Sequence, residues 1–442
     1  MENKNTTINI YDFSIWCMAS LYFFLPRRFY LLGMYSFRAI LLGLLFLLVV
    51  NNHGRIEYKR KFMAVPSIFF LMAFFRYLVA GRLASGLGYL LDTVFLMVLM
   101  TNLIRTQREF SKYIEYYCNF IGLYSILGVI ECVTGVNIWN ILTGSSQLVY
   151  VRYGLHRSYG SMTNFTNNAF FLLLSTVIVL WEIQNCKEID RRKNIIVFIL
   201  VNLNLFATLT RSAILLTLVF YLILLVRGGL LRFIKKHFVP IFIITVGIIL
   251  VFLFSNAARN IMSMLVNMFL AIIDEDAAMS IKSEFGGNVG GVGNRFQLYD
   301  WVLESIKGKE VFGAGPKMFT YNWVRGDGIA MLKDSLENEY LSVLFRFGMV
   351  GLVLYLTMIF NFIVKIYRAR RRLDSEISRI KKNMRWDSLV AIITPIYYLG
   401  GFFYAYADDS RLFLILMCLF YAFTANGIDS KEDIDNLMTE SY

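Results

Sequence analysis

Long apolar stretches recur along the whole chain and are separated by short loops that are rich in Lys and Arg. Each stretch is close to the roughly 20 residues that a helix needs to cross a hydrocarbon core of about 30 Å. Of the 442 residues, 57% are hydrophobic and only 17% are charged, whereas a soluble domain carries about 25% charged residues. The sequence therefore predicts an all-α polytopic membrane protein.

The apolar stretches predict twelve transmembrane helices. Basic residues gather near 55–61, 105–112, 187–193, 232–236 and 365–386, which the positive-inside rule assigns to the cytoplasm. One register satisfies nearly every loop, with both termini cytoplasmic. Arg27 and Arg28, in the first outward loop, are the exception. The predicted helices span approximately 13–25, 36–50, 62–80, 86–104, 116–134, 165–183, 194–208, 211–227, 238–255, 337–364, 387–405 and 410–425.

The predicted organisation is one integral membrane domain, 1–442, with a basic cytoplasmic loop at 365–386. Two outward loops are longer than tight connections, at about 135–164 and about 256–336. The larger is long enough to form a lid or a small subdomain with short helices, so we expect an outward-facing site beneath it. No repeat relates the two halves, which argues against a transporter built from inverted repeats.

Composition excludes several other classes. The formal net charge of +13 lies in the loops, where it fits topology and anionic lipid better than a nucleic acid. The N-terminus lacks the features of a removable signal peptide. The five cysteines are scattered, and the three histidines are too few for a multi-histidine metal site. We expect no metal and no cofactor. The D-x-D pair Asp274 and Asp276 is either a Mg²⁺ site or a chance pair of carboxylates.

The large loop contains the glycine-rich stretch FGGNVGGVGNRF, residues 285–296. No GK[ST] follows and no strand precedes it, so the glycines favour a flexible lid over a P-loop. Arg295 opens a helical apolar stripe formed by Phe296, Tyr299, Val302, Leu303 and Ile306. An arginine near a helix N-terminus suits a pyrophosphate. A surface arginine that contacts lipid headgroups or Asp300 is equally compatible with the pattern.

Arg211 lies between two predicted membrane helices, in FATLTRSAIL. It either snorkels to the outer headgroups or faces the bundle and holds an anion.

The stretch DSLENEYLSVLFRFGMVG, residues 334–351, places an acidic segment at the start of an apolar helix. Asp334 with Glu337 fits an acidic capping box, and Ser335 is a competing N-cap. A capping role explains one acidic residue, but not the run of polar residues Glu337, Asn338 and Glu339 that is followed by Tyr340. Arg346, inside the apolar part, needs a partner from another helix or an anionic ligand, because an unpaired membrane cation is costly. Asp92 and Glu131 are the intramembrane candidates, and a structural ion pair is the favoured role.

Several motifs occur in a fixed order along the chain. They are RSYGSMTN from Arg157 to Asn164, LTRSAIL around Arg211, Gly293-Asn294-Arg295 with Trp301, Gly313-Ala314-Gly315, Glu337-Asn338-Glu339-Tyr340-Leu341, and Gly348-Met349-Val350-Gly351. Their order and spacing resemble the O-antigen ligase/polymerase superfamily, which includes Wzy-type polysaccharide polymerases and lipid A-core O-antigen ligases. The motif matches cover about 135–352, while the predicted topology agrees across the whole chain.

The resemblance implies an inverting, metal-independent glycosyl transfer at the outer face of the cytoplasmic membrane of a bacterium. The donor would be an undecaprenyl-diphosphate-linked oligosaccharide, and a sugar hydroxyl on a second glycan would attack its anomeric carbon. Arg211 and Arg295 would hold the departing diphosphate, and Glu337 would accept the proton of the attacking hydroxyl. The implied substrate-binding residues are Arg157, Asn164, Trp301, Asn338 and Tyr340.

Ligases of this superfamily carry histidine where this chain has Glu337, which favours a polymerase of repeat units for a surface polysaccharide. Glu337 is then either the base or a group that caps the helix and orients Arg295. The nearest alternative is a ligase that moves a finished glycan onto a different acceptor, and another class is a transporter (flippase) of lipid-linked sugars. Besides donor, acceptor and membrane lipid, the implied partners are a flippase and a chain-length regulator of the same pathway.

Overall fold

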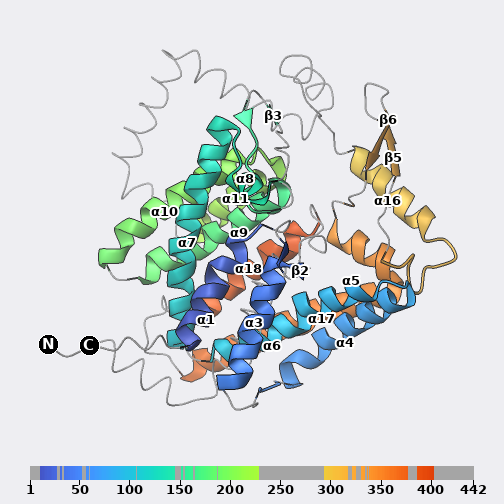
Figure 1. Cartoon of the computed structure of the whole chain (residues 1–442), viewed down its shortest axis with the longest axis horizontal. Coiled ribbons are helices and arrows are strands. Elements are labelled where there is room, and N and C mark those ends of the chain that lie inside the picture. Colours follow the sequence, from blue (N-terminus) through green and yellow to red (C-terminus); the bar gives the residue numbers. More distant parts are fainter. Residues whose placement is uncertain are drawn as a thin grey trace.

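The computed structural model describes residues 10–26, 30–31, 34–51, 56–58, 60–105, 107–144, 151–152, 155–162, 165–186, 188–227, 293–316, 321–324, 330–333, 336, 338–376 and 386–402. Within these residues the protein is almost entirely helical (Figure 1). In chain order the elements are α1 (Ile10–Ala19), α2 (Leu21–Phe24), β1 (Tyr30–Leu31), β2 (Met34–Tyr35), α3 (Ser36–Asn51), α4 (Arg60–Val79), α5 (Leu83–Leu90), the π-helical turn η1 (Leu91–Phe95), α6 (Leu96–Leu103), α7 (Gln107–Thr134), α8 (Ile138–Thr143), β3 (Val151–Arg152), β4 (Leu155–His156), α9 (Phe165–Asn185), α10 (Glu188–Ala207), α11 (Arg211–Arg227), α16 (Gly293–Ser305), β5 (Tyr321–Val324), β6 (Ala330–Lys333), α17 (Glu339–Glu376) and α18 (Trp386–Gly400).

Every predicted helix that falls within the described residues is present, although several boundaries differ. The first predicted helix is two helices, α1 and α2, and at their junction the Ser20 hydroxyl donates to the carbonyl of Trp16 (2.6 Å). Such back-bonding bends a helix. The predicted helices at 238–255 and 410–425 lie outside the described residues.

Three helices continue beyond their apolar stretches into basic segments that were expected to be loops. α7 begins at Gln107, α10 begins at Glu188 and α17 ends at Glu376. The expected cytoplasmic loop 365–386 is therefore helical as far as Glu376. Lys, Arg and Glu are good helix formers, so a charged sequence does not by itself end a helix.

Four helical stretches in the described part are long and apolar enough to cross a membrane: Leu83–Leu103, Arg108–Thr134, Phe165–Gln184 and Glu339–Lys365. Shorter apolar helices accompany them at Ile10–Phe24, Ser36–Asn51, Met63–Val79 and Ser212–Leu224. Large apolar side chains on the outer surface, such as Phe46, Val79 and Phe360, are 67%, 78% and 68% exposed. Such exposure is expected where the solvent is lipid. Twelve spans and cytoplasmic termini stay predictions.

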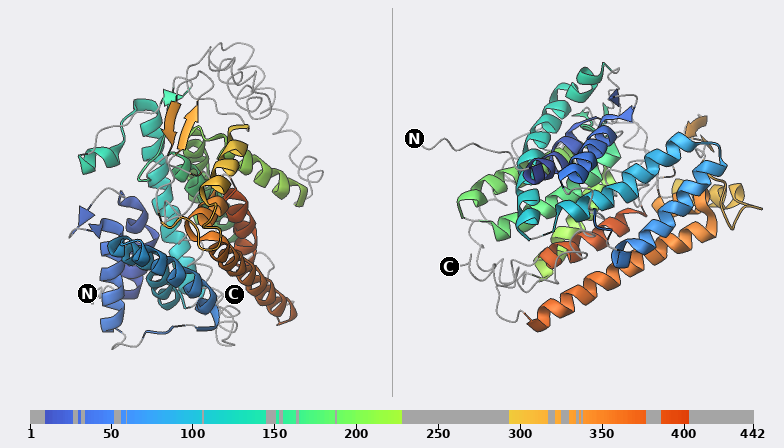
Figure 2. Two further views of the ribbon diagram at one scale, coloured as in Figure 1. Left: turned by 90° about the vertical axis from the view of Figure 1, so that its right-hand side faces the viewer. Right: turned by 60° about the horizontal axis from the view of Figure 1, so that its bottom comes forward.

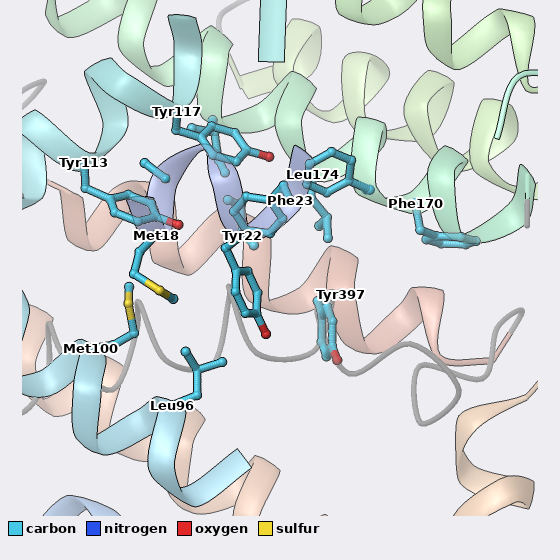
Figure 3. Packing of buried hydrophobic residues seen from close by; sticks show 14 of the residues in the cluster. Met18, Tyr22, Phe23, Leu96, Met100, Tyr113, Tyr117, Phe170, Leu174 and Tyr397 are labelled. Atoms are coloured by element: carbon cyan, nitrogen blue, oxygen red, sulfur yellow. The ribbon is translucent and has the colours of Figure 1, made fainter. Parts of the chain in front are cut away.

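The larger core cluster is rich in aromatic side chains, and α9 runs through it. Of the apolar stretch of α9, 78% is buried, against 39% for that of α17, so α9 is the central helix and α17 lies at the periphery. Within the core, the buried hydroxyls of Tyr117 and Ser175 form a hydrogen bond with each other (2.6 Å). Figure 3 shows side chains from α1, α2, α6, α7, α9 and α18 in this cluster: Met18, Tyr22, Phe23, Leu96, Met100, Tyr113, Tyr117, Phe170, Leu174 and Tyr397.

The longer predicted loops contribute short elements of their own. The segment 135–164 contains α8 and the antiparallel pair β3–β4, and the described part of 256–336 contains α16 and the antiparallel hairpin β5–β6. Strand β3 and the β5–β6 hairpin lie toward the same end of the helices (Figure 1; Figure 2, left). Both predicted outward loops therefore contribute structure to one end of the bundle.

Candidate functional site

Helices begin at or beside each of the three candidate catalytic residues. α11 begins at Arg211, Arg295 lies in the first turn of α16, and Glu337 precedes the start of α17 by two positions. The side chains of Arg211 and Arg295 lie outside the described part of the structure, as do Glu337 and Asn164. A helix start carries partial positive charge and unpaired N–H groups, which suit a phosphate group.

The first turn of α17 is capped by Asn338. Its Oδ1 accepts a hydrogen bond from the backbone N–H of Leu341 (3.0 Å), which is the geometry of an N-cap residue. The sequence assigned this role to Asp334 or Ser335 with a helix beginning at Glu337, and that assignment is wrong. Asparagine is among the strongest N-cap residues, so the helix begins after it. Because Asn338 supplies the cap, Glu337 is not needed for capping.

Asn338 also joins three elements at this junction. The residue is 4% exposed, and its Nδ2 donates to the Tyr299 hydroxyl on α16 (3.1 Å) and to the Phe402 carbonyl beyond α18 (3.2 Å). Next to it, the backbone N–H of Glu339 donates to the carbonyl of Gly401 (2.8 Å). A buried amide with these partners holds the start of α17 in place.

An apolar cluster supports the same junction. Buried side chains of α16 pack against buried side chains of the first turns of α17, and Trp301 and Tyr299 pack on them from the side. The predicted stripe on α16 is therefore confirmed at Val302 and Ile306, but Leu303 is 52% exposed. The buried members of the cluster are Leu298, Val302, Ile306, Leu336, Leu341, Leu344 and Phe345.

Tyr340 turns toward α18. Its hydroxyl donates to the carbonyl of Tyr398 (2.8 Å), and its ring lies 4.6 Å from that of Phe402, measured between centroids. The structure thus brings Trp301, Asn338 and Tyr340 to one junction of α16, α17 and α18. Their contribution to substrate binding stays a prediction.

Below this junction, charged groups gather around Tyr89. Asp92, Glu339 and Arg346 all lie close enough to act electrostatically on its hydroxyl. Asp92 forms an ion pair with Arg38, with the Nε and Nη2 atoms at 2.9 and 2.5 Å from its two oxygens. With Arg38 as a partner of Asp92, a structural ion pair for Arg346 stays a prediction.

Arg38 was not among the residues that the sequence singled out. Its guanidinium lies against α5, where a side chain at Gly88 would collide with it, and 4.9 Å from the centre of the Tyr35 ring. Asp92 lies in the π-helical turn η1, a feature that is frequent at functional sites. The sequence did contain a signal for Arg38, which is a cation within an apolar stretch. Intramembrane charges are usually paired or functional, so such a residue is a candidate.

Glu131, the other candidate partner of Arg346, is engaged by the chain segment Leu155–Met162. Its oxygens accept hydrogen bonds from the backbone N–H groups of Tyr159 (3.3 Å) and Gly160 (3.1 Å), from Nδ2 of Asn137 (2.8 Å) and from the hydroxyl of Ser158 (3.3 Å). The residue is 2% exposed. A buried carboxylate with four donors is well compensated, and it fixes the 155–162 segment against α7.

Arg157, in the same segment, contacts the turn between α10 and α11. Its Nε donates to the carbonyl of Thr208 (2.9 Å), and its Nη2 donates to the carbonyl of Leu209 (3.3 Å) and the hydroxyl of Thr210 (3.2 Å). Arg157 was predicted to bind substrate. The structure brings it instead to the residues that directly precede Arg211, and a direct contact with substrate stays a prediction.

The G-x-G and G-x-x-G motifs meet in a junction made of backbone. α17 is broken at Gly348, with φ 67° and ψ −165°, and residues 310–315 lie against the break. Four hydrogen bonds join the two segments: Ala314 N to Phe345 O (2.7 Å), Gly315 N to Arg346 O (3.2 Å), Met349 N to Glu310 O (2.8 Å) and Val350 N to Val311 O (3.1 Å). Groups that the broken helix leaves unpaired are thereby satisfied, as a low-dielectric environment requires.

The junction leaves no room for side chains on its two central glycines. A Cβ at Gly313, where φ is 70°, would lie 2.5 Å from the backbone nitrogen of Gly348, and a Cβ at Gly348 would overlap Gly313 and Val311. Arg76 donates to the carbonyl of Gly313 (3.0 Å) and holds the loop on α4. These motif glycines therefore have a structural explanation.

The candidate metal ligands that the structure describes lie scattered over the fold. Among the described residues, no group of three or more His, Cys, Asp and Glu side chains could hold a metal ion. The D-x-D pair, Asp274 and Asp276, lies outside the described residues.

The fold and the hydropathy define a helical integral membrane protein. The model of the family described as O-antigen ligase (Wzy_C) matches residues 195–356, and the resemblance to the O-antigen ligase/polymerase superfamily is thereby confirmed over that segment. A search of curated proteins finds no match. The family match supports a glycosyltransferase-type function in O-antigen-related polysaccharide biosynthesis. It fits a polymerase and a ligase equally.

Proposed function

We propose that the protein is a polymerase that joins undecaprenyl-diphosphate-linked oligosaccharide repeat units into a surface polysaccharide at the outer face of the cytoplasmic membrane. The observation that carries the proposal is that the family match at 195–356 contains Arg211, Arg295 and Glu337. Arg211 and Arg295 lie in the first turn of a helix, and Glu337 lies two positions before the first residue of one.

In the proposed reaction, a hydroxyl oxygen of the acceptor glycan attacks the anomeric carbon of the donor from the side opposite the diphosphate. The bond between that carbon and the phosphate oxygen breaks, and the electron pair leaves with undecaprenyl diphosphate. Glu337 takes the proton of the attacking hydroxyl, and Arg211 and Arg295 stabilise the negative charge that grows on the leaving group. Because Asn338 supplies the helix cap, the role of base is the one proposed for Glu337.

The remaining candidates would shape the acceptor and donor sites. Trp301 and Tyr340 offer aromatic faces near the start of α17, and Asn338 holds that start in register. Arg157 lies beside the turn that precedes α11, and Asn164 belongs to the same sequence motif as Arg157. A flippase and a chain-length regulator are the proposed pathway partners.

The test uses the full chain in lipid nanodiscs, with undecaprenyl-diphosphate repeat units as donor and acceptor and EDTA in the buffer. A ladder of product lengths is expected, and it should be lost in Arg295→Ala and Glu337→Ala at normal protein levels. Removal of one such charge-stabilising group typically costs on the order of 10²–10³ in rate. The exposed Arg192 offers a matched control, Arg192→Ala, with unchanged product.

A ligase is the second candidate, because the matching family carries that description. It predicts no ladder from repeat units alone, but a single transfer once a different acceptor is supplied. A flippase predicts transfer of intact donor between leaflets, with no new glycosidic bond. Full activity of both Arg295→Ala and Glu337→Ala would contradict the proposed site in either enzyme.

A further inference from the structure

Buried polar groups hold the 155–162 segment to the bundle. Besides the three donors that this segment provides to Glu131, the backbone N–H of Ser158 donates to the carbonyl of Ala207 at the end of α10 (3.1 Å). The Ser158 hydroxyl lies 2.9 Å from Oδ1 of Asn204, and Nδ2 of Asn168 donates to the Ser158 carbonyl (3.3 Å). Ser158 is fully buried. The segment therefore has a fixed position relative to α7, α9 and α10.

The turn that follows α10 is unusual in its backbone. Leu209 has a φ of 50°, which is the only positive φ among the described residues other than glycine. A residue in this conformation is strained and persists only where the surroundings hold it. Thr208 and Leu209 directly follow the end of α10, where carbonyl groups lack partners within the helix.

Arg157 supplies those partners. It donates hydrogen bonds to the carbonyls of Thr208 and Leu209 and to the hydroxyl of Thr210. The face of the guanidinium lies on the ring of Phe165, with Cζ 3.2 Å from the ring centre. A planar group with its edge on a turn and its face on an aromatic ring has little freedom. The next residue after this turn is Arg211.

We infer that Arg157 is a positioning residue, which fixes the turn 208–210 and thereby the placement of Arg211, and that Glu131 anchors the segment that carries Arg157. The inference deepens the proposed function and rests on the role given there to Arg211. Glu131, 26 positions before Arg157 in the sequence, is thereby linked to the proposed catalytic site. It holds the segment of Arg157, and Arg157 holds the turn before Arg211. Arg157 then acts on the reaction without touching the diphosphate.

A double-mutant cycle tests the inference in the nanodisc assay. A misplacement of about 1 Å costs on the order of a hundredfold in rate, so Arg157→Ala should lower kcat about a hundredfold and change KM less than about threefold. Arg211→Ala should lower kcat by at least as much. The double variant should be no slower than Arg211→Ala alone, because Arg157 acts through Arg211. Losses that multiply would show an independent substrate contact and overturn the inference.

A second measurement is independent of activity. Hydrogen–deuterium exchange of the full chain in nanodiscs reports on the peptide that covers 205–214. Its exchange should rise in Arg157→Ala and in Glu131→Ala relative to wild type and to the exposed control Arg192→Ala, while a peptide within α4 should be unchanged. Unchanged exchange of 205–214 in Arg157→Ala would overturn the inference whatever the activity.

Failure of the proposed function is distinguishable from failure of the inference. If wild-type protein makes no polymer and transfers no glycan, the proposed function fails, and the exchange experiment alone decides whether Arg157 holds the turn. If wild type is active and Arg211→Ala is fully active, the role of Arg211 is contradicted, and the positioning role falls with it. If exchange of the 205–214 peptide rises and the double variant is no slower than Arg211→Ala alone, the inference is supported: Arg157 holds the turn, and it acts on the reaction through Arg211.

Discussion

The 155–162 segment and the 310–315 loop are both non-helical, and they are fixed in opposite ways. The first is held by side chains, above all by the buried carboxylate of Glu131. The second is held by backbone hydrogen bonds to the break in α17 at Gly348, where side chains have no room. The two motif regions should therefore lose stability for different reasons. The 155–162 segment should be released when the carboxylate of Glu131 is removed, and the 310–315 loop should be displaced when a Cβ is added at Gly348.

The largest effect is expected at the backbone junction. Gly348 has φ and ψ values that are essentially restricted to glycine, and a Cβ there would overlap Val311 and Gly313. Strain of about 1–3 kcal/mol and overpacking of about 1–3 kcal/mol add, so Gly348→Ala should lower the free energy of unfolding by about 4 kcal/mol. Thermal unfolding in nanodiscs measures it.

Gly308 provides the matched control for this prediction. It also has a positive φ, 75°, but a Cβ there would meet nothing within 4 Å. Gly308→Ala should therefore show the strain alone, about 1–2 kcal/mol. Equal losses in both variants would mean that the close approach of the two segments is not what fixes the junction.

The second-largest loss of stability is expected at Glu131, where two substitutions separate the role of the charge from that of the side-chain shape. Glu131→Ala leaves the buried N–H groups of Tyr159 and Gly160 without an acceptor, at about 1–3 kcal/mol each, so a loss of about 3 kcal/mol is expected. Glu131→Gln keeps one oxygen and should lose about half as much. The pair is compared by thermal unfolding, and a glutamine variant as unstable as the alanine variant would show that both carboxylate oxygens are indispensable.

The third effect is at Asn338, which combines a cap with two side-chain contacts. Asn338→Ala removes the cap on α17 and both donors, and should cost about 2 kcal/mol. Asn338→Asp keeps an acceptor for the N–H of Leu341 and adds a favourable charge at a helix start, so it should recover about half of the loss. No recovery would mean that the contacts to Tyr299 and Phe402, rather than the cap, hold this junction.

Much of the helical architecture could be predicted from hydropathy. The different ways in which the 155–162 segment and the 310–315 loop are held could not. Apolar stretches of about 20 residues predict helices because a membrane leaves the backbone few alternatives. The boundaries of α7, α10 and α17 were missed because charged residues outside a membrane continue a helix as readily as they end it.

The candidate site was predictable only in part. Short motifs that occur in order along the chain pointed to Arg211, Trp301, Asn338 and Tyr340, whose roles at the site stay predictions. The break at Gly348 was not predicted, because the motif shows a glycine but not the loop that lies against it. The partners of Glu131 and Arg38 depend on which helices are neighbours, and a single sequence does not contain that information.

The smallest effect concerns the second glutamate of the comparison, Glu310, which is exposed where Glu131 is buried. Its carboxylate accepts hydrogen bonds from its own backbone N–H and from that of Gly308 (2.7 Å), and these lower the pKa of the Glu310 carboxyl below its ordinary value. A lowered pKa in the folded state stabilises the fold above the unfolded-state pKa, and that stabilisation is lost as the pH falls through the folded-state value. Between about pH 5 and pH 3, wild type should therefore lose slightly more thermal stability than Glu310→Gln does, when both are measured in nanodiscs. Identical pH profiles would show that the turn before the α17 junction is held by backbone alone, which would make the contrast with the 155–162 segment complete.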